Sequence, residues 1–261
     1  MSVADRRAAR QALALPAALA LAALAGGGAV FWTASIPHVS GPLPCATGLL
    51  DSPLDGAARE PRPGADGLLV LSASLTRENG RLRVVRGRPD WRALRAPGRS
   101  VGIALRARPG PETRAEALET TATLAGLARA LAAESRAWGV DSAEIVLDLA
   151  DPEHDLDAWR PRLLALQKAA APRPVRIAAP PSWIGRGDFL RLAAAAGSWV
   201  LKLPAPGGDS RLEPGSVRVL AERAARLRLP FRVAIPGPPD AALVRAWTDS
   251  RPETLAGVVV Y

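Results

Sequence analysis

Short apolar runs alternate with amphipathic segments along most of the chain. Apolar runs predict strands at residues 101–105, 144–148, 175–179, 199–203, 231–235 and 257–261. Segments with helical periodicity predict helices at residues 111–138, 156–170, 186–196, 216–227 and 240–248. Strands that are apolar throughout are typical of a parallel sheet that is covered on both faces. Regular alternation of strand and helix therefore predicts an α/β fold.

The region before residue 101 follows a different pattern. The apolar segments 68–75 and 82–85 are separated by Asn79-Gly80, a dipeptide typical of a hairpin turn. A short helical turn is predicted at residues 89–94. The strands number about eight, so we predict a (β/α) barrel of the TIM type, complete or irregular, over residues 67–261. An open doubly wound sheet is the alternative, and the absence of a Gly-rich phosphate loop after any strand disfavours nucleotide binding.

The N-terminal 34 residues read as a membrane segment. Three arginines precede an apolar run at residues 12–32 that is long enough to cross a bilayer. The basic flank places the N-terminus in the cytoplasm, so we predict a bacterial inner-membrane anchor and a periplasmic or otherwise extracytoplasmic main domain. The alternative is a signal peptide cleaved near Ala25, which gives a secreted protein. Residues 35–66, rich in Pro, Gly and Ala, are predicted to be a linker.

Charge and composition restrict the partners. The chain has 34 Lys and Arg against 25 Asp and Glu, a net charge of +9, but the basic residues are scattered and almost all are Arg. A nucleic-acid surface needs clustered basic residues with exposed aromatics, so no nucleic-acid partner is predicted. Cys45 is the single cysteine, which excludes an internal disulfide and a Cys metal site. With only two histidines, the segment 151–154 is interpreted as a solvated acidic turn, and neither a metal nor a cofactor is expected.

Asp148 is the candidate catalytic residue. It ends the predicted strand 144–148, and α/β barrels carry their chemistry at the C-terminal ends of strands. A role in capping the following helix is the alternative. A glycosidase needs two carboxylates about 5–10 Å apart, and no other strand end in the sequence offers one. The remaining options are Asp209 and Glu213, in the loop after residue 203, and Asp240, a weaker one, at the start of the predicted helix 240–248.

Four further residues are candidate substrate-binding positions: Asp151, Ser182, Trp183 and Lys202. Trp183 follows a strand end and could stack on a sugar ring, with core packing as the alternative. Lys202 points either outward or into the barrel mouth, where Asp148 is a candidate partner. Ser182 lacks a G-x-S-x-G elbow and a histidine partner, which favours a turn residue over a nucleophile.

A series of short segments carries a family resemblance over residues 68–237. They are LVLSASL, DWRAL, GIALRARPG, EIVLDLAD, PVRIAAPPSW, WVLKLPAP and AARLRLPFRVAIPG. Their order resembles the bacterial domain of unknown function 3142 family, whose members look like exported (β/α) barrels related in architecture to glycoside hydrolases. The resemblance implies an exported barrel with a carbohydrate ligand.

The chain departs from the pattern of that family. Where the family's central strand ends Gln-x-Asp-Phe-Asp, Asp148 is kept but Val146 and Ala150 replace the Gln and the second Asp. The family's Leu-Pro-Ser-Trp is kept as Pro181-Ser182-Trp183, and its Gln-Val-His becomes Leu201-Lys202-Leu203. The resemblance therefore implies a mouth with fewer polar groups. Two hypotheses stay open: a protein that binds or processes an envelope glycan, and a non-catalytic scaffold or binding module with a degenerate site.

Overall fold

A computed structural model of the 261-residue chain describes part of the sequence. The described residues are 45–49, 67–95, 100–108, 110–149, 155–203, 214–235, 246–247, 249–250 and 252–260. All of them belong to one compact unit, Val39–Tyr261. The predicted membrane segment, residues 1–34, lies outside the described residues. Within these ranges, no helix is both long and apolar enough to cross a membrane.

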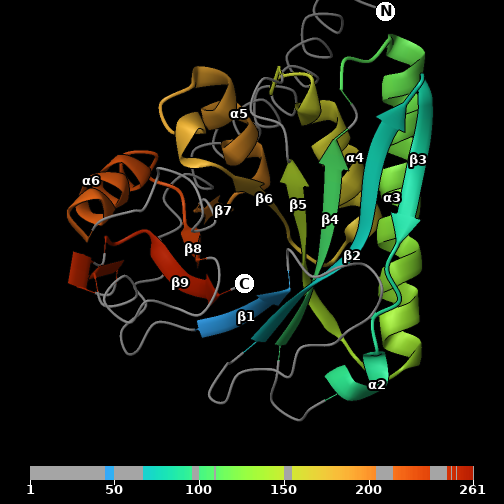
Figure 1. Ribbon diagram of the computed structural model, residues 1–261, viewed down its shortest axis with the longest axis horizontal. Coiled ribbons are helices and arrows are strands. Elements are labelled where there is room, and N and C mark those ends of the chain that lie inside the picture. Colours follow the sequence, from blue (N-terminus) through green and yellow to red (C-terminus); the bar gives the residue numbers. More distant parts are fainter. Residues whose placement is uncertain are drawn as a thin grey trace, which may run out of the picture. The chain divides into compact units, whose positions relative to one another are not determined.

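Nine strands of the described residues form one sheet, and eight of them run parallel. The strands are β1 (Cys45–Leu49), β2 (Gly67–Glu78), β3 (Arg81–Arg86), β4 (Ser100–Arg108), β5 (Ser142–Leu149), β6 (Val175–Ala179), β7 (Trp199–Lys202), β8 (Phe231–Ile235) and β9 (Leu255–Val260). Strand β1 pairs in parallel with both β2 and β9, so the eight parallel strands form a closed ring. Strand β3 pairs antiparallel with the C-terminal half of β2, residues 73–78 (Figure 1).

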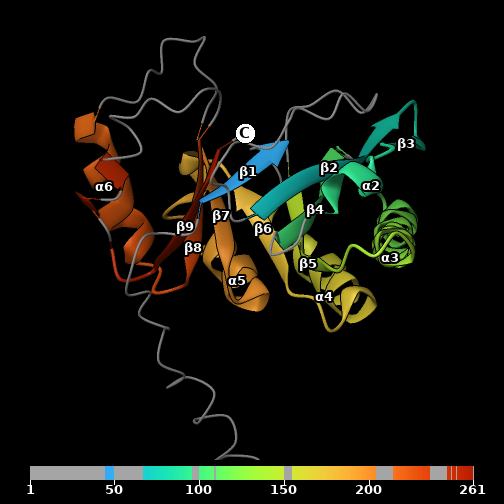
Figure 2. The ribbon, with the colours of Figure 1, turned by 90° about the horizontal axis from the view of Figure 1, so that it is seen from below.

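Helices lie on the outer side of the strands (Figure 2). They are α2 (Trp91–Leu94), α3 (Arg114–Ala137), α4 (Trp159–Ala170), the 3-10 turn η2 (Pro181–Trp183), α5 (Gly187–Ala196) and α6 (Pro214–Ala225). Helix α3 is the longest of these and begins with a capping box. The Thr113 hydroxyl accepts from the backbone N–H of Glu116, and the Glu116 carboxylate accepts from the Thr113 N–H at 2.8 Å. This reciprocal cap fixes the helix start three residues after the predicted one.

Side-chain alternation along the strands divides the apolar residues into two cores. Ile145 and Leu147 of β5 belong to a large outer core, between the strands and the helices, whereas Val146 belongs to a separate inner cluster. Because successive side chains point to opposite faces of a sheet, the inner cluster lies inside the ring. Its members are mainly small: Leu69, Leu71, Ala104, Val146, Ala178, Val200, Ala234 and Val259. They form an apolar layer across the barrel.

A run of aromatic rings crosses the outer core over β6, β7 and β8. Successive ring centroids are 5.9, 5.2, 5.3 and 6.3 Å apart. The rings, in order, are Trp183, Phe189, Trp199, Phe231 and Trp247. Edge-to-face, tilted and stacked contacts at these distances add stabilisation beyond the apolar area that they bury.

Most predicted elements between residues 67 and 235 are present. Strands 175–179 and 231–235 match the prediction residue for residue, and the Asn79-Gly80 hairpin forms with positive φ at both turn residues. The difference lies at Cys45–Leu49, which falls within the predicted linker and forms strand β1. Its strand conformation comes from pairing with β2 and β9 rather than from its own composition.

Trp138 is the last residue of the predicted helix 111–138, but it is the C-cap residue of α3 and its side chain is exposed. Gly139, with φ at 72°, ends the helix there, because glycine adopts the left-handed conformation without a steric penalty. Helix α3 therefore ends at Ala137, one residue before the predicted end.

Candidate functional site

Asp148 lies at the C-terminal end of β5, on the inner face of the barrel. Its carboxylate is buried, and its Oδ2 accepts hydrogen bonds from two cations of other strands. Arg106 Nε of β4 donates at 2.9 Å, and Lys202 Nζ of β7 donates at 3.1 Å. We call Arg106, Asp148 and Lys202 the mouth cluster. Strand register explains the contacts, because Arg106 is the direct partner of Asp148 in the sheet.

Lys202 reaches Asp148 across an intervening strand. Asp148 pairs in register with Ala178 of β6, and Ala178 pairs in register with Val200 of β7. An alanine at the intervening position leaves space above it, so the long lysine side chain can cross β6. The pairing also supplies the partner that an inward-pointing lysine needs.

Donor groups lie nearer to solvent than the acceptor in the mouth cluster. Side-chain exposure is 15% for Arg106 and 23% for Lys202, against 2% for Asp148. A ligand that approached along the barrel axis would therefore meet N–H donors first. Such donors suit hydroxyl, carboxylate or phosphate oxygens.

A second charged group lies inside the barrel at the opposite, N-terminal end. The Glu144 carboxylate accepts from Arg176 Nε through one oxygen and from Arg232 Nη1, at 2.5 Å, through the other. Arg176 also donates to the Ser198 hydroxyl at 2.7 Å. We call Glu144, Arg176 and Arg232 the base cluster. Charged residues at this end of a (β/α) barrel serve stability rather than chemistry.

Gly102 of β4 makes room for the base cluster. A Cβ atom at this position would lie 3.0 Å from Cγ of Glu144 and 3.0 Å from Cδ1 of Leu69. Any larger residue would press on the glutamate from the neighbouring strand. The glycine at this position therefore leaves the space that the Glu144 side chain needs inside the barrel.

Two of the predicted site residues come together, and the others do not. Asp148 and Lys202 are joined by an ion pair at the mouth. Trp183 is 1% exposed and contacts Phe189 in the outer core, so the proposed stacking on a sugar ring does not fit its position. Ser182 is exposed in the turn η2. Asp151 lies outside the described residues, as do the loop carboxylates at 209, 213 and 240.

An acidic side chain near the start of α5 has a structural role. Asp188 pairs with Arg186, with Nη2 to Oδ2 at 2.6 Å and Nε to Oδ1 at 3.0 Å. These bonds lower the pKa of Asp188 from 3.8 to about 2, and the backbone N–H of Phe189 contributes in the same direction. Asp155, before α4, accepts from the backbone N–H of Asp157 at 3.0 Å and forms a turn there.

The mouth and base clusters contain four residues that sequence reasoning missed: Arg106, Glu144, Arg176 and Arg232. The sequence carries a signal for two of them, Arg176 and Arg232. Strands β6 and β8 read VRIAA and FRVAI, so each has an arginine at its second position between apolar residues. A charge repeated at the second position of two otherwise apolar strands indicates an inward-facing partner.

Comparisons with known proteins support the fold alone. No family model matches the chain. No curated protein matches it either. Among solved structures, it is similar to a protein assigned as chitinase A from Streptomyces coelicolor, with a TM-score of 0.57 and 14% sequence identity. The alignment covers 84% of this chain and 91% of that chain.

Proposed function

We propose that this protein binds a glycan of the cell envelope at the mouth of its barrel, with Arg106 and Lys202 as the donors. The single observation that carries the proposal is the mouth cluster, in which two cations converge on the buried oxygen of Asp148. Sugar hydroxyl and ring oxygens are acceptors that such donors recognise. The likeness of the barrel to a chitinase structure supports the same ligand class.

Processing of the glycan is the second candidate function. The chitinase-like fold favours it, and Asp148 at a strand end would be the acid, base or ligand group. Within the described residues, Asp148 is the one carboxylate of the mouth cluster, and its Oδ2 is already engaged by two cations. Hydrolysis needs a second carboxylate. Binding is therefore the stronger proposal.

The two lysines of the sequence give a matched test of the mouth. Calorimetric titration with chitin oligosaccharides and with peptidoglycan fragments would compare the wild type, Lys202→Met and Lys168→Met. Lys168 is exposed on α4, outside the barrel interior. We expect Lys202→Met to weaken binding about tenfold, because a hydrogen bond from a charged donor contributes on the order of 1.5 kcal/mol, and Lys168→Met to bind as the wild type.

Equal affinity of all three proteins would contradict glycan binding at the mouth. A reducing-end assay on the same sugars separates binding from processing. Release of new reducing ends by the wild type and its loss in Asp148→Asn would establish processing.

We further propose that the chain is a divergent, exported member of the domain of unknown function 3142 family. The ordered segments over residues 68–237 support the resemblance, and the N-terminal apolar run supports export with an anchor at residues 1–34. Protease treatment of spheroplasts tests the location. Degradation of the main domain without cell lysis supports export, and protection contradicts it.

A further inference from the structure

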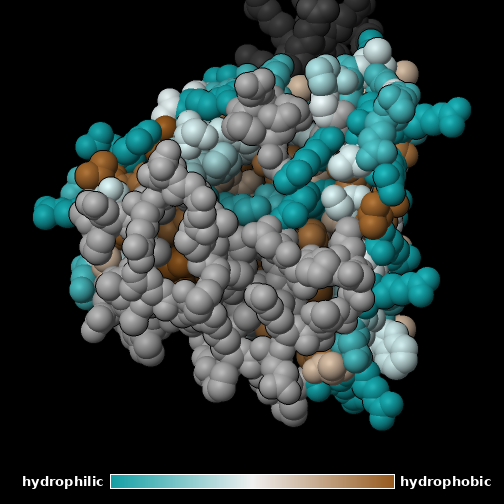
Figure 3. Space-filling model, in the orientation of Figure 1, coloured by the Kyte–Doolittle hydropathy of each residue, from teal (hydrophilic) through white to brown (hydrophobic). Residues whose placement is uncertain are grey.

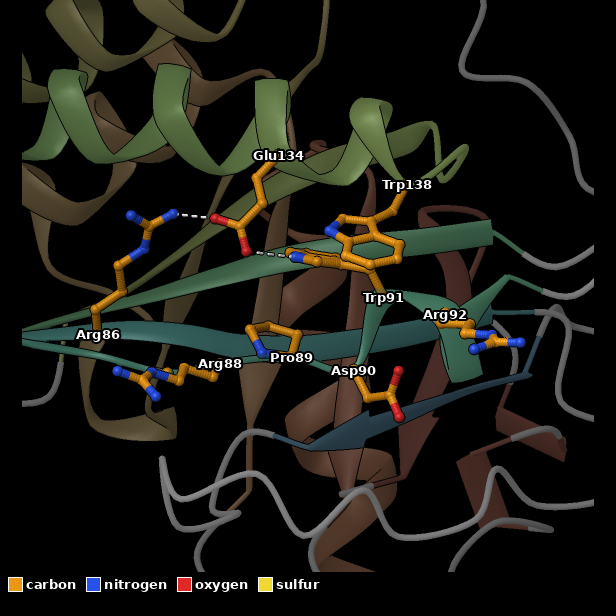
Figure 4. Close-up of a pocket in the computed structure, with 9 residues that line it drawn as sticks. Arg86, Arg88, Pro89, Asp90, Trp91, Arg92, Glu134 and Trp138 are labelled. Carbon is orange, nitrogen blue, oxygen red and sulfur yellow. Dashed lines mark hydrogen bonds and ion pairs between the residues drawn. The ribbon is translucent and has the colours of Figure 1, made fainter.

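The connection between β2 and β4 leaves a hollow on the flank of the barrel. It consists of the β2–β3 hairpin and the single turn α2, whereas the connections from β4 to β8 carry the longer helices α3, α4, α5 and α6. A pocket of about 580 Å³ lies between the β3–α2 segment and the C-terminal end of α3 (Figure 4). We call it the flank pocket. Its lining residues are Arg86, Gly87, Arg88, Pro89, Asp90, Trp91, Arg92, Glu134 and Trp138.

Glu134 of α3 binds two other lining residues of the flank pocket. Its Oε1 accepts from Trp91 Nε1 at 2.8 Å, and its Oε2 is paired with Arg86 Nη2 (Figure 4). Trp91 is 2% exposed and anchors α2 to the outer core. Both carboxylate oxygens are therefore oriented before any ligand arrives, and a preorganised polar group reduces the entropy lost on binding.

An exposed indole and two exposed guanidinium groups complete the pocket. Trp138 is 53% exposed although it lies at the end of a helix that packs on the barrel. Arg88 and Arg92 extend on either side of Asp90 in Figure 4. Neither arginine has an acidic partner among the described residues. The surface over α3 and β3 is otherwise mainly hydrophilic, with separate apolar patches (Figure 3).

These groups match one ligand chemistry. An indole face packs on the apolar face of a sugar ring, and a guanidinium group forms paired hydrogen bonds with a carboxylate. Three arginines against Asp90 and Glu134 leave the lining with a net charge of +1, which favours an anion. The volume lies within the range of about 300–1,000 Å³ that is usual for small-ligand pockets.

We propose that the flank pocket binds an acidic sugar unit of a glycan chain, with its ring on Trp138 and its carboxylate at Arg88 or Arg92. The pocket shares no residue with the mouth cluster, so this function goes beyond the one proposed for the mouth. A single-stranded nucleic acid is disfavoured, because successive bases need several exposed rings and the described lining offers one.

Calorimetry with a galacturonic-acid oligosaccharide and the full chain tests the proposal. A neutral galactose oligosaccharide of the same length is the ligand control. Trp138→Ala and the double variant Arg88→Gln/Arg92→Gln should each weaken binding about tenfold, whereas Trp138→Phe should retain most of it. All three positions are exposed, so the substitutions leave the core intact. Arg136→Gln is the matched control, because Arg136 is exposed on the same helix but does not line the pocket.

Several outcomes would overturn the proposal. Equal affinity for the neutral oligosaccharide would exclude recognition of the acidic group. Unchanged binding in Trp138→Ala and in the double arginine variant would exclude the flank pocket. Tighter binding of a single-stranded oligonucleotide would assign the surface to nucleic acid. Loss of acidic-sugar binding in Lys202→Met, with the flank variants unaffected, would place that ligand at the mouth and leave the mouth function standing.

Discussion

The mouth cluster and the base cluster each hold one carboxylate between two cations inside the barrel. In the base cluster each oxygen of Glu144 has its own guanidinium group. In the mouth cluster both cations converge on a single oxygen of Asp148. Two cations that share one oxygen repel each other more strongly than two that are separated by a carboxylate. The base cluster thus spreads its two guanidinium groups over both carboxylate oxygens, whereas the mouth cluster directs both of its cations to one oxygen.

The largest expected effect distinguishes the two clusters by stability. Glu144→Gln removes the charge that balances Arg176 and Arg232, and we expect it to lower the free energy of unfolding by about 3 kcal/mol. Asp148→Asn should cost about 1–2 kcal/mol, because Lys202 has a flexible stem that can turn to solvent at the mouth. Urea unfolding followed by circular dichroism measures both. Equal losses would contradict the expected difference between the two clusters.

A smaller effect comes from a carboxylate outside the barrel interior. The pKa of Asp188 is about 2 in the folded protein, below its ordinary value of 3.8, so its stabilisation is present above pH 3.8 and is lost as the pH falls through about 2. The difference in pKa corresponds to about 2 kcal/mol at most. Its charge-assisted bonds to Arg186 are the main cause.

Acid unfolding of Asp188→Asn should therefore show a shallower loss of stability between about pH 4 and about pH 2 than the wild type. Arg186→Gln is the complementary variant, because it removes the main cause of the shift and should flatten the same interval. If both variants lost stability with falling pH as steeply as the wild type, the acid sensitivity would come from other carboxylates, including those of the two interior clusters.

The smallest expected effect is the coupling between the clusters. Glu144 and Asp148 are four residues apart on β5, which places them about 13 Å apart along the strand. The apolar layer around Val146 lies between them. The double variant Glu144→Gln/Asp148→Asn should therefore lose the sum of the single losses to within about 0.5 kcal/mol. A coupling above about 1 kcal/mol would show that the layer does not separate the clusters.

Much of the fold could be predicted because the strands of the barrel are apolar on both faces. Strands β6 and β8 stand out as short apolar runs between polar turns, and their bounds follow directly. Strand β1 could not be predicted, since CATGL has few strongly β-forming residues and lies among prolines. Its strand conformation depends on hydrogen bonds to β2 and β9, segments distant from it in sequence.

The candidate site was predictable in part for a related reason. Asp148 is visible as a charge at the end of an apolar strand, and an inward Lys202 needs a partner of opposite sign. Arg106 could not be assigned because it looks like the polar end of its strand, whereas β4 continues to Arg108. Trp183 shows the limit of local reasoning, because a residue after a strand end can turn back into the outer core.

The aromatic run over β6, β7 and β8 gives the protein a built-in optical reporter. Five described indoles, Trp91, Trp159, Trp183, Trp199 and Trp247, are at most 2% exposed, while Trp138 is 53% exposed. Trp32 lies outside the described residues. Emission from the buried indoles depends on the integrity of the outer core, whereas Trp138 is directly accessible to a soluble quencher. Trp183, Trp199 and Trp247 all pack against the phenylalanines of that run, so disorder in it exposes these indoles to water and changes their emission.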